Sequence, residues 1–380
     1  MHAPLSKFYR VEWRDVAALK PLADEIRALA ARAAEPNVFY EPAFMLAAAP
    51  VFGARVGATL VRTSTGRLAG VFPARKERPR GGTLAMLTGW THPFAPLGVP
   101  LVDRDDPEGV IAAWLDRLAH DPQTPAVLLM PHLPDTGAFA IALDTVLARK
   151  GQASTRFGHH ERALLDPGSD RAGYIERAIS SGRRKEFRRQ RRRLEDIAPV
   201  SFAQACSPDD VAAALQDFLV LEASGWKGVA GTAIVDDPAV KTFVQDAVAG
   251  LAAEHHARID RMLLDGRAIA ATVTLQSGGT AWCWKIGYNE GAARFSPGVQ
   301  LVCELTERLM ADCKVARVDS CAAAEHPMID HIWRERLALS DRLIAVRRSA
   351  IPFALACRME RLRRSGIAAA KQVRSRLRRR

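Results

Sequence analysis

The sequence lacks the features of membrane-spanning, secreted and zinc-binding proteins. It holds no run of about 18 uncharged apolar residues, so no transmembrane helix is expected. The first ten residues contain no apolar signal core and lead into Glu12, Arg14 and Asp15. The cysteines form no Cys-x-x-Cys pair, and no nearby histidines complete a zinc-like spacing. We therefore expect a cytoplasmic protein with reduced cysteines and no metal.

Lysine is scarce, at 10 residues against 44 arginines, and the cations are concentrated in two segments. Residues 183–193 carry +7 and residues 358–380 carry +9, which leaves −4 for the rest of a chain whose net charge is +12. A nucleic-acid-binding domain spreads its positive charge over a folded face. Nucleic acid is therefore a disfavoured partner, and the two basic segments need separate explanations.

The length of 380 residues predicts two domains, and both halves alternate strand-like and helix-like segments. The strands expected from residue pattern are 56–62, 68–74, 126–130, 259–264, 268–275, 282–288 and 315–318, the last ending at Asp319. The expected helices are 107–118, 139–148, 236–253 and about 299–310. Residues 81–100, rich in proline, glycine and tryptophan, are expected to form a long loop.

A short similarity between two segments of the chain indicates that the two halves are related. Gly66-Arg67-Leu68-Ala69-Gly70 and Gly266-Arg267-Ala268-Ile269-Ala270 both occupy the turn of an expected hairpin that follows an apolar helix. Breaks in the pattern near residues 166–181 place the join there. We expect domains at 1–165 and 166–350, followed by a basic amphipathic helix and a tail at 351–380.

The segment after Tyr288 has the features of an anion site. A strand is expected to end there, and the next helix starts at about Val299, preceded by Ser296-Pro297-Gly298. The free N–H groups of a first helical turn carry a partial positive charge, and Gly298 permits close backbone approach. A pyrophosphate suits this geometry. The alternative is an ordinary Pro-Gly helix start.

Several motifs follow one another in a specific order after the arginine-rich helix. They are Trp226-Lys227-Gly228, the hairpin at Gly266, Lys285-Ile286-Gly287-Tyr288 and Ser296-Pro297-Gly298. Over about residues 174–344 the chain resembles the GNAT-like acyltransferase family associated with bacterial cellulose and exopolysaccharide synthesis, which is similar to the Fem-type peptidyltransferases. The resemblance implies an α/β (α+β) fold of two tandem GNAT-like domains, each a mixed central sheet flanked by helices. The multi-glycine loop of typical GNAT enzymes is missing.

The resemblance also implies an activity. The expected enzyme transfers an acyl group from acetyl-CoA or another acyl-CoA, without a metal, to an amine of a sugar, an amino acid or a cell-envelope precursor. The amine attacks the thioester directly. Two alternatives stay open: a Fem-like peptidyltransferase that depends on aminoacyl-tRNA, and a non-catalytic scaffold of a polysaccharide-synthesis complex.

Site roles follow from the same resemblance, each set against the alternative of a packed or solvated side chain. The expected donor-binding residues are Lys285, Ser296, Gly298, Val299 and Gln300. The expected catalytic residues are Tyr288, which donates a proton to the thiolate, and Asp319, Glu325 and His326 as candidate bases. The expected acceptor-binding residues are Trp226, Lys227 and Trp284.

The two basic segments leave several interpretations open. Residues 183–193 form either a solvated helix face or a contact for an anionic acceptor, a nucleotide, tRNA or the CoA phosphates. In the last segment an apolar stripe that includes Leu355 and Leu362 lies beside Arg358 and Arg361. This pattern fits peripheral attachment to an anionic membrane, with solubility as the alternative. Residues 371–380 are expected to be disordered when free.

Overall fold

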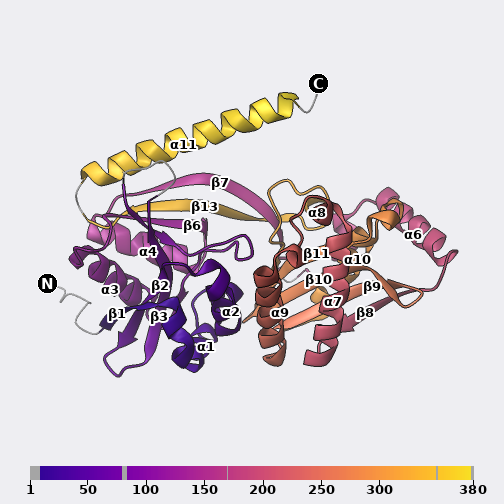
Figure 1. The fold of residues 1–380 in the computed structure, drawn as a ribbon, viewed down its shortest axis with the longest axis horizontal. Coiled ribbons are helices and arrows are strands. Elements are labelled where there is room, and N and C mark those ends of the chain that lie inside the picture. The colour runs from indigo at the N-terminus through magenta and orange to yellow at the C-terminus, as the bar shows by residue number, and fades with distance from the viewer. Residues whose placement is uncertain (1–8, 79–83, 169, 348–349, 378–380) are drawn as a thin grey trace. The chain divides into compact units, whose positions relative to one another are not determined.

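The computed structural model of the chain describes residues 9–78, 84–168, 170–347 and 350–377 (Figure 1). The chain divides into two compact units, each assembled from separate segments. Unit 1 comprises Met1–Glu35, Arg55–His160 and Ala338–Arg380, and unit 2 comprises Pro36–Ala54 and Glu161–Leu337. The sequence analysis divides the chain at single points instead. The difference arises because α2 (Pro42–Phe52) packs on α9 (Pro238–Ala253) of unit 2, while the chain after residue 337 returns to unit 1.

Unit 1 is a mixed sheet with helices packed against it. Its strands are β1 (Tyr9–Asp15), β2 (Val56–Thr63), β3 (Leu68–Glu77), β4 (Met86–Gly89), β5 (Leu101–Val102), β6 (Val127–Pro134), the first part of β7 (Ser154–Leu165) and most of β13 (Glu335–Ala345). Its helices are η2 (Val16–Leu22), α1 (Ala23–Ala30), α3 (Pro107–His120), α4 (Ala138–Lys150) and α11 (Ala350–Leu377). The strand order is β1-β2-β3-β4-β6-β13, with β5 on β3. Only β4 and β6 are parallel neighbours among these described strand pairs.

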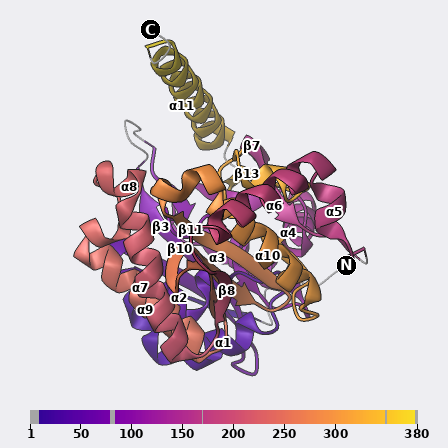
Figure 2. The same cartoon turned by 90° about the vertical axis from the view of Figure 1, so that its right-hand side faces the viewer.

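Unit 2 repeats this strand pairing. Its strands are the end of β7, β8 (Val200–Ala205), β9 (Ala257–Leu264), β10 (Arg267–Ser277), β11 (Thr280–Tyr288) and β12 (Arg317–Asp319). Its helices are η3 (Val38–Tyr40), α2, α5 (Tyr174–Ala178), α6 (Ser181–Glu195), α7 (Pro208–Ser224), α8 (Trp226–Val229), η4 (Ile234–Asp236), α9, η5 (Glu290–Phe295), α10 (Pro297–Ala311) and η6 (Ile329–His331). The order is β8-β9-β10-β11-β12-β7, antiparallel except for the parallel pair β11 and β12. Figure 2 shows α7 and α9 on one face of this sheet and α10 on the other.

Because the two units pair their strands in the same order, the two hairpins predicted from the similar segments lie at equivalent positions. Gly66 lies between β2 and β3, and Gly266 lies between β9 and β10, both with a positive φ. The tight turn of each hairpin requires this backbone conformation, which glycine adopts at little cost. The fold class of mixed sheets flanked by helices is thus confirmed, together with the predicted strands and helices.

Two local expectations were wrong. The expected loop at residues 81–100 contains a strand, β4, because Met86, Leu87 and Thr88 are buried between β3 and β6. At the other end, α11 runs on to Leu377, so most of the segment expected to be disordered is helical.

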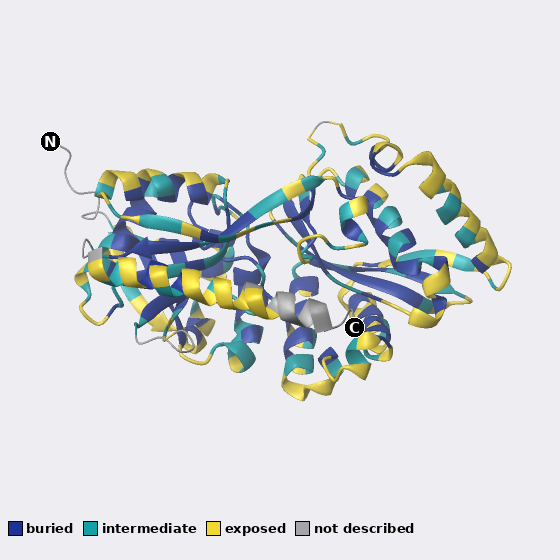
Figure 3. Cartoon of the chain, turned by 90° about the horizontal axis from the view of Figure 1, so that it is seen from above, coloured by how far each residue is buried: buried dark blue, intermediate teal, exposed yellow. Residues whose placement is uncertain are grey.

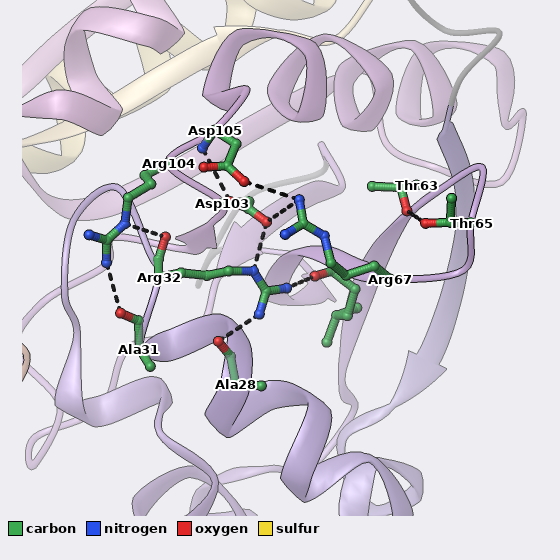
Figure 4. A network of polar contacts seen from close by, with 10 residues as sticks. Ala28, Ala31, Arg32, Thr63, Thr65, Arg67, Asp103, Arg104 and Asp105 are labelled. Atoms are coloured by element: carbon green, nitrogen blue, oxygen red, sulfur yellow. Dashed lines mark hydrogen bonds and ion pairs between the residues drawn. The ribbon is translucent and has the colours of Figure 1, made fainter.

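A buried aspartate fixes the end of β5 in unit 1 (Figure 4). Arg32 Nε donates to Asp103 Oδ2 at 2.8 Å, and Arg67 Nη2 lies 3.2 Å from the same oxygen. Arg104 donates to the carbonyl oxygens of Ala31 and Arg32 at 2.7 and 3.0 Å. Because Asp103 is only 2% exposed, its charge needs these partners. The network ties the end of α1 to the hairpin at Gly66.

No single helix of the described residues is long and apolar enough to cross a membrane. The bent pair Pro208–Ser224 and Trp226–Asp236 meets the length and composition criteria only when taken together.

Because β13 completes the sheet of unit 1, we expect the fragment 1–165 to be unable to fold alone. Without residues 338–345 the outer edge of β6 loses its antiparallel partner and exposes unpaired backbone groups. The fragment should aggregate or lack a cooperative thermal transition by circular dichroism. Co-expression with 166–380 should restore a soluble complex. A monomeric fragment with a sharp transition would contradict this prediction.

Candidate active site

The strands β11 and β12 separate soon after they begin. Their parallel pairing covers only Thr280 to Trp282, opposite Arg317 to Asp319. In the described structure β12 ends there, whereas β11 continues to Tyr288. The edge of β11 beyond Trp282 therefore extends past its neighbour and presents backbone groups that an extended ligand can pair with.

A β-bulge lies at the start of this open edge. Val273 of β10 pairs with Lys285, and the next residue, Thr274, pairs with Cys283, so Trp284 is the extra residue. The Trp284 ring packs edge-on against Phe44, with ring centroids 5.5 Å apart. Bulges bend a strand and redirect its side chains, and they are frequent beside active sites. This one changes which face of the sheet the side chains beyond Trp284 occupy.

The start of α10 lies against the end of β11. Ser296 adopts a left-handed conformation, with φ of 52°, and Pro297 opens the helix. Within the described structure the Ser296 side chain forms no capping hydrogen bond to the first turn. A Cβ atom on Gly298 would lie 3.2 Å from Tyr288 Cδ1 and 3.5 Å from Met328 Sδ. Glycine thus lets the helix start approach Tyr288 closely, with its partial positive charge available to an anion.

The other predicted donor-site residues support this turn from behind. Gln300 is buried, and its Nε2 donates to the carbonyl oxygen of Phe295 at 2.8 Å. Val299 is partly buried and packs on the core cluster between α10 and the sheet. Both residues position the helix start.

Charged side chains gather on the opposite face of β11, beside α7 and α8. Lys227 Nζ donates to Glu222 Oε1 at 2.6 Å, and Glu222 Oε2 accepts the backbone N–H of Ile234 at 2.8 Å. Burial and, to a smaller extent, the positive charge of Lys227 lower the pKa of Lys285 to about 8. Lys285 therefore loses its proton at a pH where an ordinary lysine keeps it.

Trp226 lies at the surface, with 65% of the residue exposed. Its backbone N–H donates to Glu290 Oε1 at 2.8 Å, which fastens the start of α8 to η5. Tyr288 is also accessible, at 38%. Their accessibility is consistent with the predicted contacts to small-molecule substrates.

Asp319 is deeply buried and forms an ion pair with Arg162 of β7. Its Oδ1 also accepts the backbone N–H of Cys321 at 2.9 Å. Burial disfavours the charge of Arg162, but the Asp319 carboxylate more than offsets this, so the pKa of Arg162 is raised. A carboxylate engaged in this way holds the loop after β12 in place.

The two other candidate bases lie on that loop. Glu325 is exposed and has a positive φ of 57°. His326 is partly buried, and its Nδ1 accepts the backbone N–H of Met328 at 3.3 Å. Burial lowers the pKa of His326, against a smaller effect of Asp330. The ring is therefore neutral near pH 7, with its proton on Nε2.

Sequence reasoning missed the partners that come from distant segments. Three of them lie far from the predicted site residue that they contact: Arg162 is 157 positions from Asp319, Glu290 is 64 from Trp226, and Met328 is 30 from Gly298. Glu222, five positions before Lys227, is the one that spacing could have indicated, since a helix end places such residues near each other.

A second group missed by spacing lies where the segment 36–54 joins unit 2. Ligating atoms of Glu41, Glu254 and His256 lie within 4.8 Å of one another. Glu41 Oε1 accepts a hydrogen bond from Ser277 Oγ at 2.6 Å, and His256 Nδ1 lies 3.8 Å from Glu254 Oε2. These contacts attach the start of α2 to β10 and to the end of α9.

A groove of about 440 Å³ lies between α6 and α10. Its charged lining residues are Arg184, Arg188, Arg191, Glu176, Glu304 and Glu307, set among apolar side chains. The basic helix predicted at residues 183–193 thus places part of its positive charge in a groove that both basic and acidic side chains line. The rest, including Arg192 and Arg193, is exposed.

Comparisons with known proteins agree with this geometry. Residues 181–326 match the family model described as the acetyltransferase (GNAT) domain. Residues 181–326 form a GNAT acyltransferase domain. The match spans β8 to β12 and α10, so it contains the open edge of β11.

Solved structures share the fold over both units at low identity. FemX is similar with a TM-score of 0.58 and 8% identity, over 85% of this chain and 95% of that one. The C-terminal domain of a putative lysylphosphatidylglycerol synthetase from Agrobacterium fabrum gives 0.54 and 10%, over 88% and 93%. A conserved protein of unknown function from Bacteroides thetaiotaomicron gives 0.54 and 11%, over 88% and 99%. No curated protein matches the chain in sequence.

The buried ion pair of Arg162 and Asp319 yields a stability prediction. Asp319→Ala should lower the free energy of unfolding by about 3–5 kcal/mol, because it leaves the Arg162 charge buried without its partner. The double variant Arg162→Met/Asp319→Leu removes both charges and should recover most of the loss. Urea denaturation followed by circular dichroism measures both. Equal stability of Asp319→Ala and the wild type would rule out this structural role.

Proposed function

We propose that the GNAT domain transfers an acyl group from an acyl-CoA, with acetyl-CoA as the simplest donor, to an amine. The acceptor class is an amino group on a sugar, an amino acid or a cell-envelope precursor, such as a glycan precursor for polysaccharide synthesis. The observation that carries the proposal is the open edge of β11, which ends beside the uncapped start of α10.

Both ends of an acyl-CoA suit this arrangement. The amides of the pantetheine arm can pair with the extended backbone of β11 between Cys283 and Tyr288, as an added strand would. The pyrophosphate suits the first turn of α10, where Gly298 and Val299 contribute backbone N–H groups. Ser296 sets the turn, and its side chain leaves the helix start available.

The equivalent helix of unit 1 does not favour an anion. Its α3 starts at Asp106, whose Oδ1 accepts the backbone N–H of Gly109 at 2.9 Å. Asp106 Oδ2 also accepts the hydroxyl of Tyr9 at 2.7 Å. A carboxylate that already caps a helix start repels a phosphate there. We therefore assign donor binding to unit 2.

The proposed reaction moves one acyl group and one proton. The acceptor nitrogen attacks the thioester carbonyl carbon, whose oxygen is polarised by a backbone N–H of β11 beyond the bulge. The C–N bond forms, the C–S bond breaks, and Tyr288 gives its proton to the leaving thiolate. Lys285, with its pKa near 8, accepts the proton that the amine loses. Trp226, Lys227 and Trp284 shape the acceptor side, and Asp319 acts as a positioning residue for the loop that carries Glu325 and His326.

A second candidate is transfer from aminoacyl-tRNA, as a Fem-like peptidyltransferase would perform. The observation that favours it is the set of exposed cations on α6. They are Arg183, Lys185, Arg188, Arg189, Arg192 and Arg193. This candidate requires RNA binding with a steep salt dependence, whereas the leading proposal requires none.

Calorimetric titration with acetyl-CoA and longer acyl-CoAs tests the donor site. The wild type should bind one of them saturably, and Gly298→Trp should weaken binding at least about tenfold by filling the space between Tyr288 and Met328. Gly366→Trp is the matched control, since a Cβ there meets no described atom within 4 Å. Absence of binding by the folded wild type, together with salt-sensitive tRNA binding, would transfer support to the second candidate.

The pH dependence of single-turnover transfer tests the proton acceptor. Lys285 must be neutral to accept a proton, so the rate should rise with pH through about 8 and then level off. Lys285→Met should abolish this rise of the rate with pH and should lower the rate by about 100-fold or more. Tyr288→Phe should slow the reaction by a similar factor. Its acyl-CoA affinity and the rise of its rate near pH 8 should be the same as in the wild type. A rise of the rate near pH 8 that persists in Lys285→Met would show that Lys285 is not the proton acceptor.

A further inference from the structure

The C-terminal helix α11 has one face that belongs to unit 1. Ala356 and Cys357 are buried in a core cluster with Met86, Val127, Phe157 and Leu343, and Phe353 packs on that cluster. One and two turns further along, Glu360 and Arg364 face the same way: Glu360 is 8% exposed, and Arg364 pairs with Asp341 of β13 at 2.5 Å. This face fixes the helix to the unit.

Much of α11 is exposed (Figure 3), and three large aliphatic side chains lie on the face opposite to Glu360. Ile351, Leu355 and Leu362 are 79%, 43% and 66% exposed. At about 100° per residue they lie within roughly 40° of one another and diametrically across the helix from Glu360. Three large aliphatic side chains in one exposed line are unusual for a surface that meets only water.

The charges on α11 are arranged around this stripe. Arg358 and Arg361 are exposed and lie on one flank of it. Glu360, which is the only acidic residue from Arg358 to the end of the chain, is turned toward unit 1, where Arg363 and Arg364 donate to it at 2.5–2.7 Å. The outward face is therefore apolar and cationic, with no described carboxylate to reduce its charge.

We propose that α11 docks unit 1 onto an anionic lipid surface. The helix lies in the plane of the interface, with Ile351, Leu355 and Leu362 at headgroup depth and the arginines against lipid phosphates. A nucleic acid would use the cations and leave the aliphatic stripe in water. A second copy of the chain would bring Arg358 and Arg361 against their own counterparts. A lipid surface satisfies both parts of the face.

The experiment is co-sedimentation of the full chain with vesicles, using pure phosphatidylcholine and phosphatidylcholine with about a third phosphatidylglycerol. The wild type should bind the anionic vesicles, bind neutral ones far less, and lose affinity as salt rises. Arg358→Gln/Arg361→Gln should reduce the partition coefficient by about fivefold for each arginine, so about thirtyfold for both. Leu355→Ser/Leu362→Ser should reduce it by roughly tenfold or more.

Matched controls separate the face of α11 from general charge and apolarity. Arg10→Gln/Arg267→Gln makes the same change in charge at exposed positions outside α11, and Ile197→Ser/Val220→Ser replaces two aliphatic residues of similar exposure in unit 2. Both should change the partition coefficient less than about twofold. All variants alter exposed side chains, so their melting temperatures and acyl-CoA binding should match the wild type.

Several outcomes would overturn the proposal. Vesicle binding that is absent, equal on neutral lipid, or equal in the α11 variants and the controls would do so. So would a dimer detected by light scattering without lipid and lost in Leu355→Ser/Leu362→Ser, because a second copy would then cover the stripe. Binding of a single-stranded RNA through the two arginines, with no binding to vesicles, would assign the face to nucleic acid.

Discussion

Each unit completes its sheet with a strand that the other half of the sequence supplies. After α4 the chain enters β7, whose end pairs with β12 of unit 2, and β13 returns after unit 2 to pair with β6 of unit 1. The buried Arg162–Asp319 pair joins β7 to β12 at this exchange. Because β7 covers the far side of β12, that strand can be short and still be held on both edges. A short β12 is what leaves the edge of β11 open, so the candidate site depends on the exchange.

The repeated pairing also explains how two related units come to differ in chemistry. Both build four antiparallel strands followed by a parallel neighbour, and in both a helix lies in the sequence between the two strands of the parallel pair. In unit 1 the Asp106 carboxylate caps the start of α3. In unit 2 the left-handed Ser296 precedes α10, and its side chain forms no described capping hydrogen bond. One residue at each helix start thus determines whether a side chain of the protein already binds the free N–H groups of the first turn or whether they stay available to a ligand.

The sequence revealed the elements of the fold well, because their signals are local. The turns at Gly66 and Gly266, and the helix at 236–253, were predicted from local residue patterns and are confirmed. The strand β4 was missed because its burial comes from β3 and β6, not from its own short pattern.

The candidate site was predictable only where one segment supplies it. The approach of Tyr288 to Gly298 follows from ten residues of chain, and the sequence pattern pointed to it. The bulge at Trp284 and the partner of Asp319 depend on how distant strands align, which no local spacing encodes. Pairing across 157 residues with a buried arginine is decided by the assembled sheet. The place of Asp319 at a strand end was visible in the sequence, but its ion pair with Arg162 was not.

The electrostatics of the acceptor side follow from one carboxylate. Glu222 is buried and accepts hydrogen bonds from both Lys227 and the backbone of Ile234, so its charge is fully engaged. It thereby holds the side chain of Lys227 in place near Lys285. Since a neighbouring positive charge and burial both favour the neutral form of a lysine, Lys285 is the one that releases its proton. Burial and the nearby charge of Lys227 thus outweigh the opposite effect of Glu222 on the pKa of Lys285, as the proton acceptor of the proposed reaction would require.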